Sequence, residues 1–251
     1  HYCALDSLLP DPLPHHDAIF VAIGDAPEHR PLLNALSQAL SSWPVQVFNH
    51  PQAIPNTQRD TACQILQDIP GVRIPPTYRT TRAQLNAIAK KANDLSLIAP
   101  DLDFPLIIRP LDSHAGRDLA CVDDCAAVQR YLDSVTSTEF FIAPFIDYSG
   151  ADGLFRKYRI ALIAGQAFAV HMAVSAHWMI HYVNAGMYED AKKRQEEAWF
   201  MVHFDRFIAR HEQALSMIAE RMGLDYVCFD GAETQAGELL IFEIDHVMVV
   251  H

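Results

Sequence analysis

The sequence predicts an α/β (α+β) fold with more than one lobe. Short apolar runs of strand type alternate with amphipathic helical stretches in the first 146 residues, and longer strand-like segments follow from Leu154 onward. Half of the 251 residues are apolar, which suffices for one large core or for two or three smaller ones. We therefore expect helices packed on sheets in three consecutive units.

The first unit is expected to span residues 1–76 as a small α/β lobe. A short apolar run that stops at Gly24-Asp25 predicts a buried strand, and leucines at helical spacing predict the helix that follows it. Pro70-Gly71 and Pro75-Pro76 indicate where this lobe ends. The expected elements are strand 17–23, helix 31–40, strand 45–48 and helix 56–66.

The second unit, residues 77–146, is expected to form another small α/β structure. Its elements are strand 104–110, return strand 118–122, helix 125–133 and strand 139–146. The polar loop 112–117 joins the first two strands, and its small pair Ala115-Gly116 would let backbone N–H groups approach a phosphate closely. A plain surface turn is the alternative interpretation of this loop.

The third unit, residues 147–251, is expected to contain long antiparallel strands and one amphipathic helix. Strands 157–163 and 167–174 meet at Gly165-Gln166, and helix 206–222 ends at Gly223. A final hairpin pairs residues 226–230 with 239–245 around a turn at Ala236-Gly237.

The final hairpin places acidic side chains together. A turn centred between residues 236 and 237 puts Asp230 directly opposite Glu243, and the period of two adds Asp245 to the same face. Converging carboxylates repel one another unless a cation neutralises them, and oxygen-only ligands favour magnesium or manganese. A surface hairpin with acids that line up by chance is the alternative. The opposite face is apolar and suits a core: Val227, Phe229, Leu240, Phe242 and Ile244.

Cations and histidines form a second group of candidate residues. Arg109 ends an apolar strand, and Lys157 and Arg159 stand two positions apart on another. Such cations require anionic partners, which are either protein carboxylates in internal salt bridges or a bound ligand. His177 and His181 lie in an aromatic, polar segment, where a structural role is the default interpretation.

Composition excludes several functional classes. A net charge of −12 without a long basic stretch argues against nucleic acid as a partner. No apolar run is long enough for a bilayer span, so no membrane partner is expected. Five scattered cysteines suit a reducing compartment, and we expect a cytoplasmic protein. The chain opens without methionine, which indicates a piece of a longer protein; a homodimer is also left open.

The order of these motifs resembles the ATP-grasp superfamily over nearly the whole chain. The resemblance rests on FPLIIRP, SHAG, FFIAPFID, RKYRI and the final FD…FEID hairpin. Within the superfamily, HWMIHY and FEIDHVMVVH are similar to RimK-like modules that accompany tetratricopeptide proteins. The resemblance implies an ATP-grasp fold preceded by a pre-ATP-grasp lobe at residues 1–76.

The resemblance also implies a site for ATP and magnesium (or manganese). Asp230, Glu243 and Asp245 would hold the metal, although aspartate replaces the family's asparagine at 245. Arg109 would contact phosphate in place of the usual lysine. Arg159 and Lys157 would face the γ-phosphate and the acyl group, and His181 or His177 would orient or deprotonate an amine. The remaining cofactor-binding residues would be Ser113, His114 and Gly116 over the phosphates, Ala143 and Phe145 at adenine, and Asp147 near the ribose.

The activity implied is an ATP-dependent carboxylate-amine ligase that works through an acylphosphate. Its substrate would be an amino acid, a peptide or a related small acid. Two alternatives stay open. One is a catalytically silent ATP-grasp domain that binds nucleotide or peptide, which the substitutions at 109 and 245 suggest. The other is a kinase that stops at phosphoryl transfer.

Overall fold

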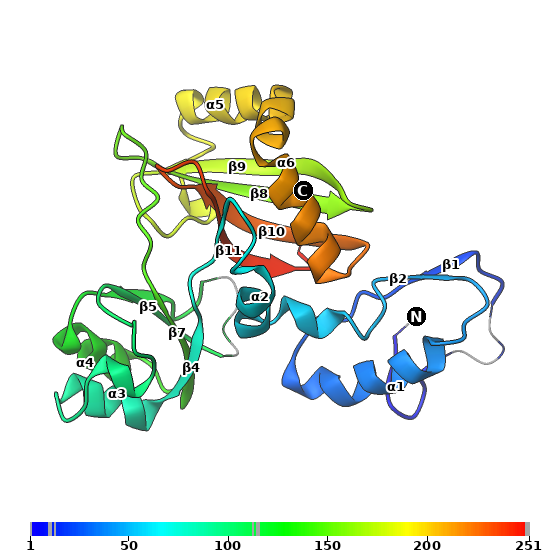
Figure 1. Ribbon diagram of the computed structural model, residues 1–251, viewed down its shortest axis with the longest axis horizontal. Coiled ribbons are helices and arrows are strands. Elements are labelled where there is room, and N and C mark those ends of the chain that lie inside the picture. Colours follow the sequence, from blue (N-terminus) through cyan, green and yellow to red (C-terminus); the bar gives the residue numbers. More distant parts are fainter. Residues whose placement is uncertain (1, 10–11, 13, 112, 114–115, 249–251) are drawn as a thin grey trace.

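The computed structural model describes residues 2–9, 12, 14–111, 113 and 116–248, which build three sheets (Figure 1). Their strand orders are β1-β2, β4-β7-β5-β6 and β3-β11-β10-β8-β9. Within the described residues, four short 3₁₀ helices lie at Pro27–His29, Ile54–Thr57, Leu95–Leu97 and Tyr182–Asn184.

The N-terminal lobe contains the parallel strands β1 (Ala18–Phe20) and β2 (Gln46–Phe48), which are connected by α1 (Arg30–Leu40). One stripe of α1 is buried, with Leu33, Leu36 and Leu40 at helical spacing. The predicted strand, helix, strand order at residues 17–48 is thereby confirmed, with shorter strands than expected. The first strand was expected to be buried, but Ala18 and Phe20 are exposed and Ile19 is partly buried, because one face of β1 packs inward.

The next two elements attach to the largest sheet. Helix α2 (Arg59–Leu66) contacts α6 and β11, and β3 (Val72–Arg73) pairs in parallel with Leu239 and Leu240 of β11. Residues 59–73, which were expected in the N-terminal lobe, therefore pack beside the final hairpin.

The four-stranded sheet forms a separate lobe with two helices. It comprises β4 (Tyr78–Thr81), β5 (Leu106–Pro110), β6 (Ala120–Val122) and β7 (Glu139–Pro144), all in antiparallel pairs. Helices α3 (Arg82–Ala89) and α4 (Cys125–Ser134) pack against each other and share a core with the sheet (Figure 1). The sequence interpretation missed β4 and α3, although Thr81 and Gln84 form a reciprocal capping box at the start of α3.

The five-stranded sheet carries the long predicted strands, β8 (Phe155–Ile163) and β9 (Gln166–Ser175). Helix α6 (Phe204–Met222) ends at Gly223, whose φ of 64° is the left-handed conformation that glycine adopts without strain. Helix α5 (Ala191–Val202) precedes α6, and both contact β9. No helix of the described residues combines the length and apolar character required to cross a bilayer.

The final hairpin, β10 (Tyr226–Glu233) and β11 (Leu239–Asp245), has the predicted register of Asp230 opposite Glu243. The sequence did not predict a bulge between Asp230 and Gly231, where Gly231 faces Ile241 and leaves Phe242 as the extra residue. Phe242 was expected in the core with Leu240, but it is only partly buried and its ring lies 4.8 Å from that of Tyr148. The bulge is the reason, because it interrupts the alternation of faces.

Candidate functional site

A cavity of about 520 Å³ lies between the four-stranded and five-stranded sheets. Its walls come from β5, β7, β8, β10 and β11, from the linker after β7, and from the segment around His181. Apolar side chains line one part, including Ile107, Phe145, Tyr148, Trp178 and Phe242. The charged part contains Arg59, Arg109, Lys157, Arg159, Asp230 and Glu243.

Asp230 is held by two cations of the neighbouring strand. Lys157 Nζ donates to its Oδ2 at 2.8 Å, and Arg159 Nε donates to its Oδ1 at 2.7 Å. Residues two apart on β8 share a face, so both cations reach the same carboxylate. Burial opposes ionisation of Asp230, but Arg159 and Lys157 outweigh it and lower the pKa of the carboxyl group.

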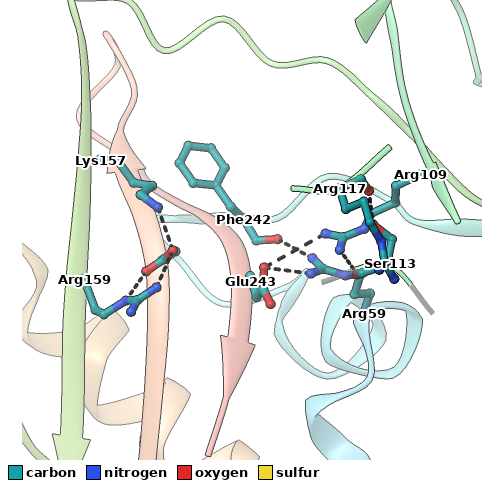
Figure 2. Close-up of polar contacts among 9 residues, drawn as sticks. Arg59, Arg109, Ser113, Arg117, Lys157, Arg159, Phe242 and Glu243 are labelled. Carbon is teal, nitrogen blue, oxygen red and sulfur yellow. Dashed lines mark hydrogen bonds and ion pairs between the residues drawn. The ribbon is translucent and has the colours of Figure 1, made fainter. Parts of the chain in front are cut away.

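Glu243 is paired with two arginines from other elements (Figure 2). Arg59, the first residue of α2, donates from Nη2 to Oε2 at 2.7 Å, and Arg109 Nη1 lies 4.0 Å from the same oxygen. Burial would raise the pKa of Glu243, but Arg59 and then Arg109 overcome that effect and lower it.

Arg109 is nearly buried beside the loop that follows β5. Its Nη2 donates to the carbonyl of Ser113, and its Nε has no hydrogen-bond partner among the described residues. Burial, followed by repulsion from Arg59, lowers the pKa of Arg109 to about 10. The guanidinium is therefore still charged at neutral pH and has a free donor in a desolvated place.

Asp245 does not join the other two carboxylates. Strand β11 ends at this residue, and its Oδ1 accepts the backbone N–H groups of His246 at 2.7 Å and Val247 at 3.3 Å. Asp245 lines a second cavity, and no group of three or more acidic, cysteine or histidine side chains in the described ranges is placed to hold a metal. The expected convergence of three acids is thus found for Asp230 and Glu243 alone.

His181 lies in the cavity and touches the loop that carries Gly116. A Cβ at Gly116 would collide with Nε2 of His181, and Gly116 has a φ of 70°. Burial, and next the charge of Lys157, lower the pKa of His181 below its usual value. Its imidazole is therefore neutral at pH 7. His177 is exposed and is not among the residues that line the cavity.

The other predicted loop residues are only partly described. Ser113 is buried, its hydroxyl donates to the carbonyl of Arg117, and it lines the second cavity. His114 lies outside the described residues. In the described part of the loop, Arg109, Ser113 and Arg117 are thus tied together by hydrogen bonds.

Strand β7 and the linker after it contribute two of the three predicted residues to the cavity. Ala143 and Phe145 line it, and the ring of Phe145 meets that of Trp178 at 5.7 Å. Asp147 is exposed, lies outside the lining, and accepts the backbone N–H of Ser149 at 2.9 Å.

Arg59 was missed by sequence reasoning, as were the ring contributions of Tyr148 and Trp178. Nothing near Arg59 in the sequence indicates its partner, because Glu243 lies in the last strand. Arg59 and Glu243 also line the second cavity, of about 630 Å³, together with Thr57, Phe141 and Ile244. The two cavities therefore meet at the Arg59–Glu243 ion pair.

No family model matches the sequence. The chain is similar in structure to the VanG D-Ala:D-Ser ligase of Enterococcus faecalis, with a TM-score of 0.51, 14% identity, and coverage of 94% of this chain and 65% of that one. For the D-alanine–D-alanine ligase of Bacillus anthracis, solved with ATP, the values are 0.51, 14%, 92% and 67%. For a RimK domain ATP-grasp protein of Sphaerobacter thermophilus they are 0.50, 15%, 94% and 75%.

The chain shares the fold of these three proteins, one of them an ATP-grasp protein, as the resemblance predicted. It spans 65% of the length of the first of them and 67% of the second.

Proposed function

We propose that this chain is an ATP-dependent carboxylate-amine ligase that works through an acylphosphate on an amino acid, a peptide or a related small acid. The observation that carries the proposal is a single cavity with an apolar part and a part where four cations face two carboxylates. A nucleotide has the matching chemistry, since its base is flat and weakly polar and its phosphates are anionic. The ligase neighbours, one of them solved with ATP, support the same activity.

The apolar part would take the base. Ala143 at the end of β7 and Phe145 directly after it would contact adenine, with Tyr148 and Trp178 beside them. Asp147 would approach the ribose from the edge. Arg109 would meet the phosphates with its free Nε donor. The loop residues Ser113, His114 and Gly116 would cover them.

Asp230 and Glu243 fit a nucleotide-borne Mg²⁺ (or Mn²⁺) by the chemistry of their donors. Magnesium in nucleotide sites is held by one or two carboxylates together with the phosphates. Asp230 and Glu243 are opposite each other in the hairpin register, and both line the cavity. Asp245 does not line this cavity, and backbone N–H groups hold its Oδ1 at the end of β11. When bound, the ion would neutralise phosphate charge.

In the first step, an oxygen of the substrate carboxylate attacks the γ-phosphorus, the bond to the β-γ bridging oxygen breaks, and ADP leaves. Arg159 and Lys157 would offset the charge that develops on the phosphoryl oxygens. Both stay correctly aimed because Asp230 holds them. Positioning and charge neutralisation supply most of the catalysis in such a transfer.

In the second step, an amine nitrogen attacks the acyl carbon, phosphate leaves, and the nitrogen loses a proton. His181 is neutral in this environment and could accept that proton. The products are an amide, ADP and phosphate.

The test is ADP release by the wild type and by Glu243→Gln with a panel of acids and amines. The substitution keeps the side-chain shape, so we expect a folded protein with ADP release reduced at least about 100-fold. Wild-type turnover in Glu243→Gln would rule out a role for Glu243 in the reaction.

A nucleotide-binding module without turnover is the second candidate. It is favoured by the pairing of both Asp230 carboxylate oxygens with Lys157 and Arg159, which occupies the oxygens that a metal ion would need. ATP binding without ADP production across the panel would select this candidate. Phosphate release that needs both an acid and an amine would exclude it, and release that needs no amine would instead indicate a kinase.

A further inference from the structure

Arg59 is joined to the final hairpin by two bonds. Its Nη2 meets Oε2 of Glu243 at 2.7 Å, and its Nη1 donates to the carbonyl of Phe242 at 3.2 Å. Figure 2 shows Arg59 and Arg109 pointing to Glu243 from one side, while Lys157 and Arg159 lie on the other. One carboxylate oxygen thus serves two guanidinium groups.

The pairing of Glu243 differs from that of Asp230 in its origin. Arg159 lies opposite Asp230 in the β8–β10 register, so their contact is built into the sheet. Arg59 instead reaches Glu243 from α2, a helix outside the sheet. The side chains of Arg59 and Glu243 are 21% and 35% exposed, whereas that of Asp230 is 10% exposed. The Arg59–Glu243 pair is therefore the more exchangeable of the two.

A divalent ion and the Arg59 guanidinium cannot both bind the Glu243 carboxylate at close range. Arg109 already lies 4.0 Å from the same oxygen, and a metal would add two more positive charges to a crowded, partly desolvated place. Like charges at this separation repel, and the least constrained cation would leave first. That cation is Arg59, which would keep its bond to the Phe242 carbonyl and face the second cavity.

We propose that Arg59 competes with the nucleotide's metal ion for Glu243 and thereby sets the metal concentration that nucleotide binding requires. The proposal rests on the nucleotide site of the proposed function. Arg59 is then a positioning residue, which acts through Glu243 and holds this carboxylate in place until the metal arrives.

The experiment is calorimetric titration of ATP at a series of free Mg²⁺ concentrations, which gives the half-saturating Mg²⁺ without any turnover. In Arg59→Gln we expect that concentration to fall about fivefold, because Glu243 loses a competing partner. In Arg59→Lys the charge is kept and the value should return close to that of the wild type.

Arg79→Gln is the matched control. Arg79 also lines the second cavity, but it pairs with Asp60 at 2.7 Å and not with Glu243, so the Mg²⁺ requirement should not change. A merely structural role for Arg59 would weaken the site and raise the requirement.

If Arg59→Gln still binds ATP but its Mg²⁺ requirement is unchanged or raised, the proposed competition is wrong, while the nucleotide site stands. If Arg59→Gln does not fold, two other variants test the competition. A half-saturating Mg²⁺ concentration in Arg59→Ala equal to that of the wild type would overturn it, and so would a raised concentration in Arg59→Lys. Absence of ATP binding in the wild type at every Mg²⁺ concentration would overturn both this proposal and the nucleotide site. A lack of ADP production would affect only the proposed activity.

Discussion

Asp230 lies directly opposite Arg159 in the pairing of β10 with β8, and two hydrogen bonds of 2.7 and 3.0 Å join their side chains. Lys157, two residues away on β8, completes the arrangement at 2.8 Å. A buried carboxylate that pairs with two cations supports the sheet as well as the site. Its removal should therefore be felt in stability as well as in binding.

We expect Asp230→Asn to lower the free energy of unfolding by about 3 kcal/mol, because it leaves buried cations without compensation. Urea denaturation measures this change. Asp152→Asn is the matched control, since the Asp152 carboxylate is 49% exposed in its pair with Arg156 and its loss should have little effect. Equal effects of the two substitutions would contradict the structural role of Asp230.

Acid stability should depend on Glu233, which pairs with Arg210 and His211. Burial would raise the pKa of Glu233, but His211 and Arg210 outweigh it and lower the pKa from 4.5 to about 2. Since the folded pKa is depressed, the stabilisation is present above pH 4.5 and is lost as the pH falls toward 2. Glu233→Gln should be less stable than the wild type at neutral pH, and the difference should shrink across this window in thermal melts. A constant difference would exclude the linkage.

The bulge should make Gly231 difficult to replace. A Cβ there would press against the carbonyl oxygen of Leu240, which is backbone and cannot move aside alone. We expect Gly231→Ala to destabilise the protein by about 2 kcal/mol, measured by chemical denaturation. Gly24→Ala should be tolerated, because a Cβ there meets only a Val247 methyl group at 3.4 Å. Reversal of this order would show that the bulge relaxes easily.

The pH profile of amide formation should report His181. Burial and Lys157 lower its pKa below 6.5, so the neutral base persists as the pH falls to that value. With an acid and amine found in the substrate screen, we expect the acid limb of kcat/KM, which reports the free enzyme, to have its midpoint below pH 6.5. In His181→Gln this limb should disappear and kcat should be reduced. An unchanged limb would assign the proton transfer to another group.

The hairpin register could be predicted because a turn position fixes which residues face each other, and Asp230 and Glu243 are indeed opposite. The bulge could not be predicted, because one inserted residue leaves no local signal in the sequence. As a result of the bulge, Phe242 lies outside the core in which it was expected. Asp245 follows the alternation in sequence, but its carboxylate caps the turn at the end of β11.

Helices α3 and α5 and the Arg59–Glu243 contact differ in how far the sequence could predict them. The Thr81–Gln84 capping box could have revealed α3. The sequence of helix α5 shows little amphipathic pattern, because Phe200 alone is buried among the residues of this helix. Arg59 reaches Glu243 only through tertiary packing between α2 and β11, which no local pattern encodes.

The most direct test of the nucleotide site is thermal unfolding with ATP and Mg²⁺, in the wild type and in Lys157→Gln. Arg159 still neutralises Asp230 in this variant, so the fold should persist while a phosphate-binding charge is lost. We expect millimolar ATP with Mg²⁺ to raise the wild-type Tm and to raise that of Lys157→Gln much less. An equal rise in both would place ATP elsewhere on the protein, and no rise in the wild type would contradict nucleotide binding altogether.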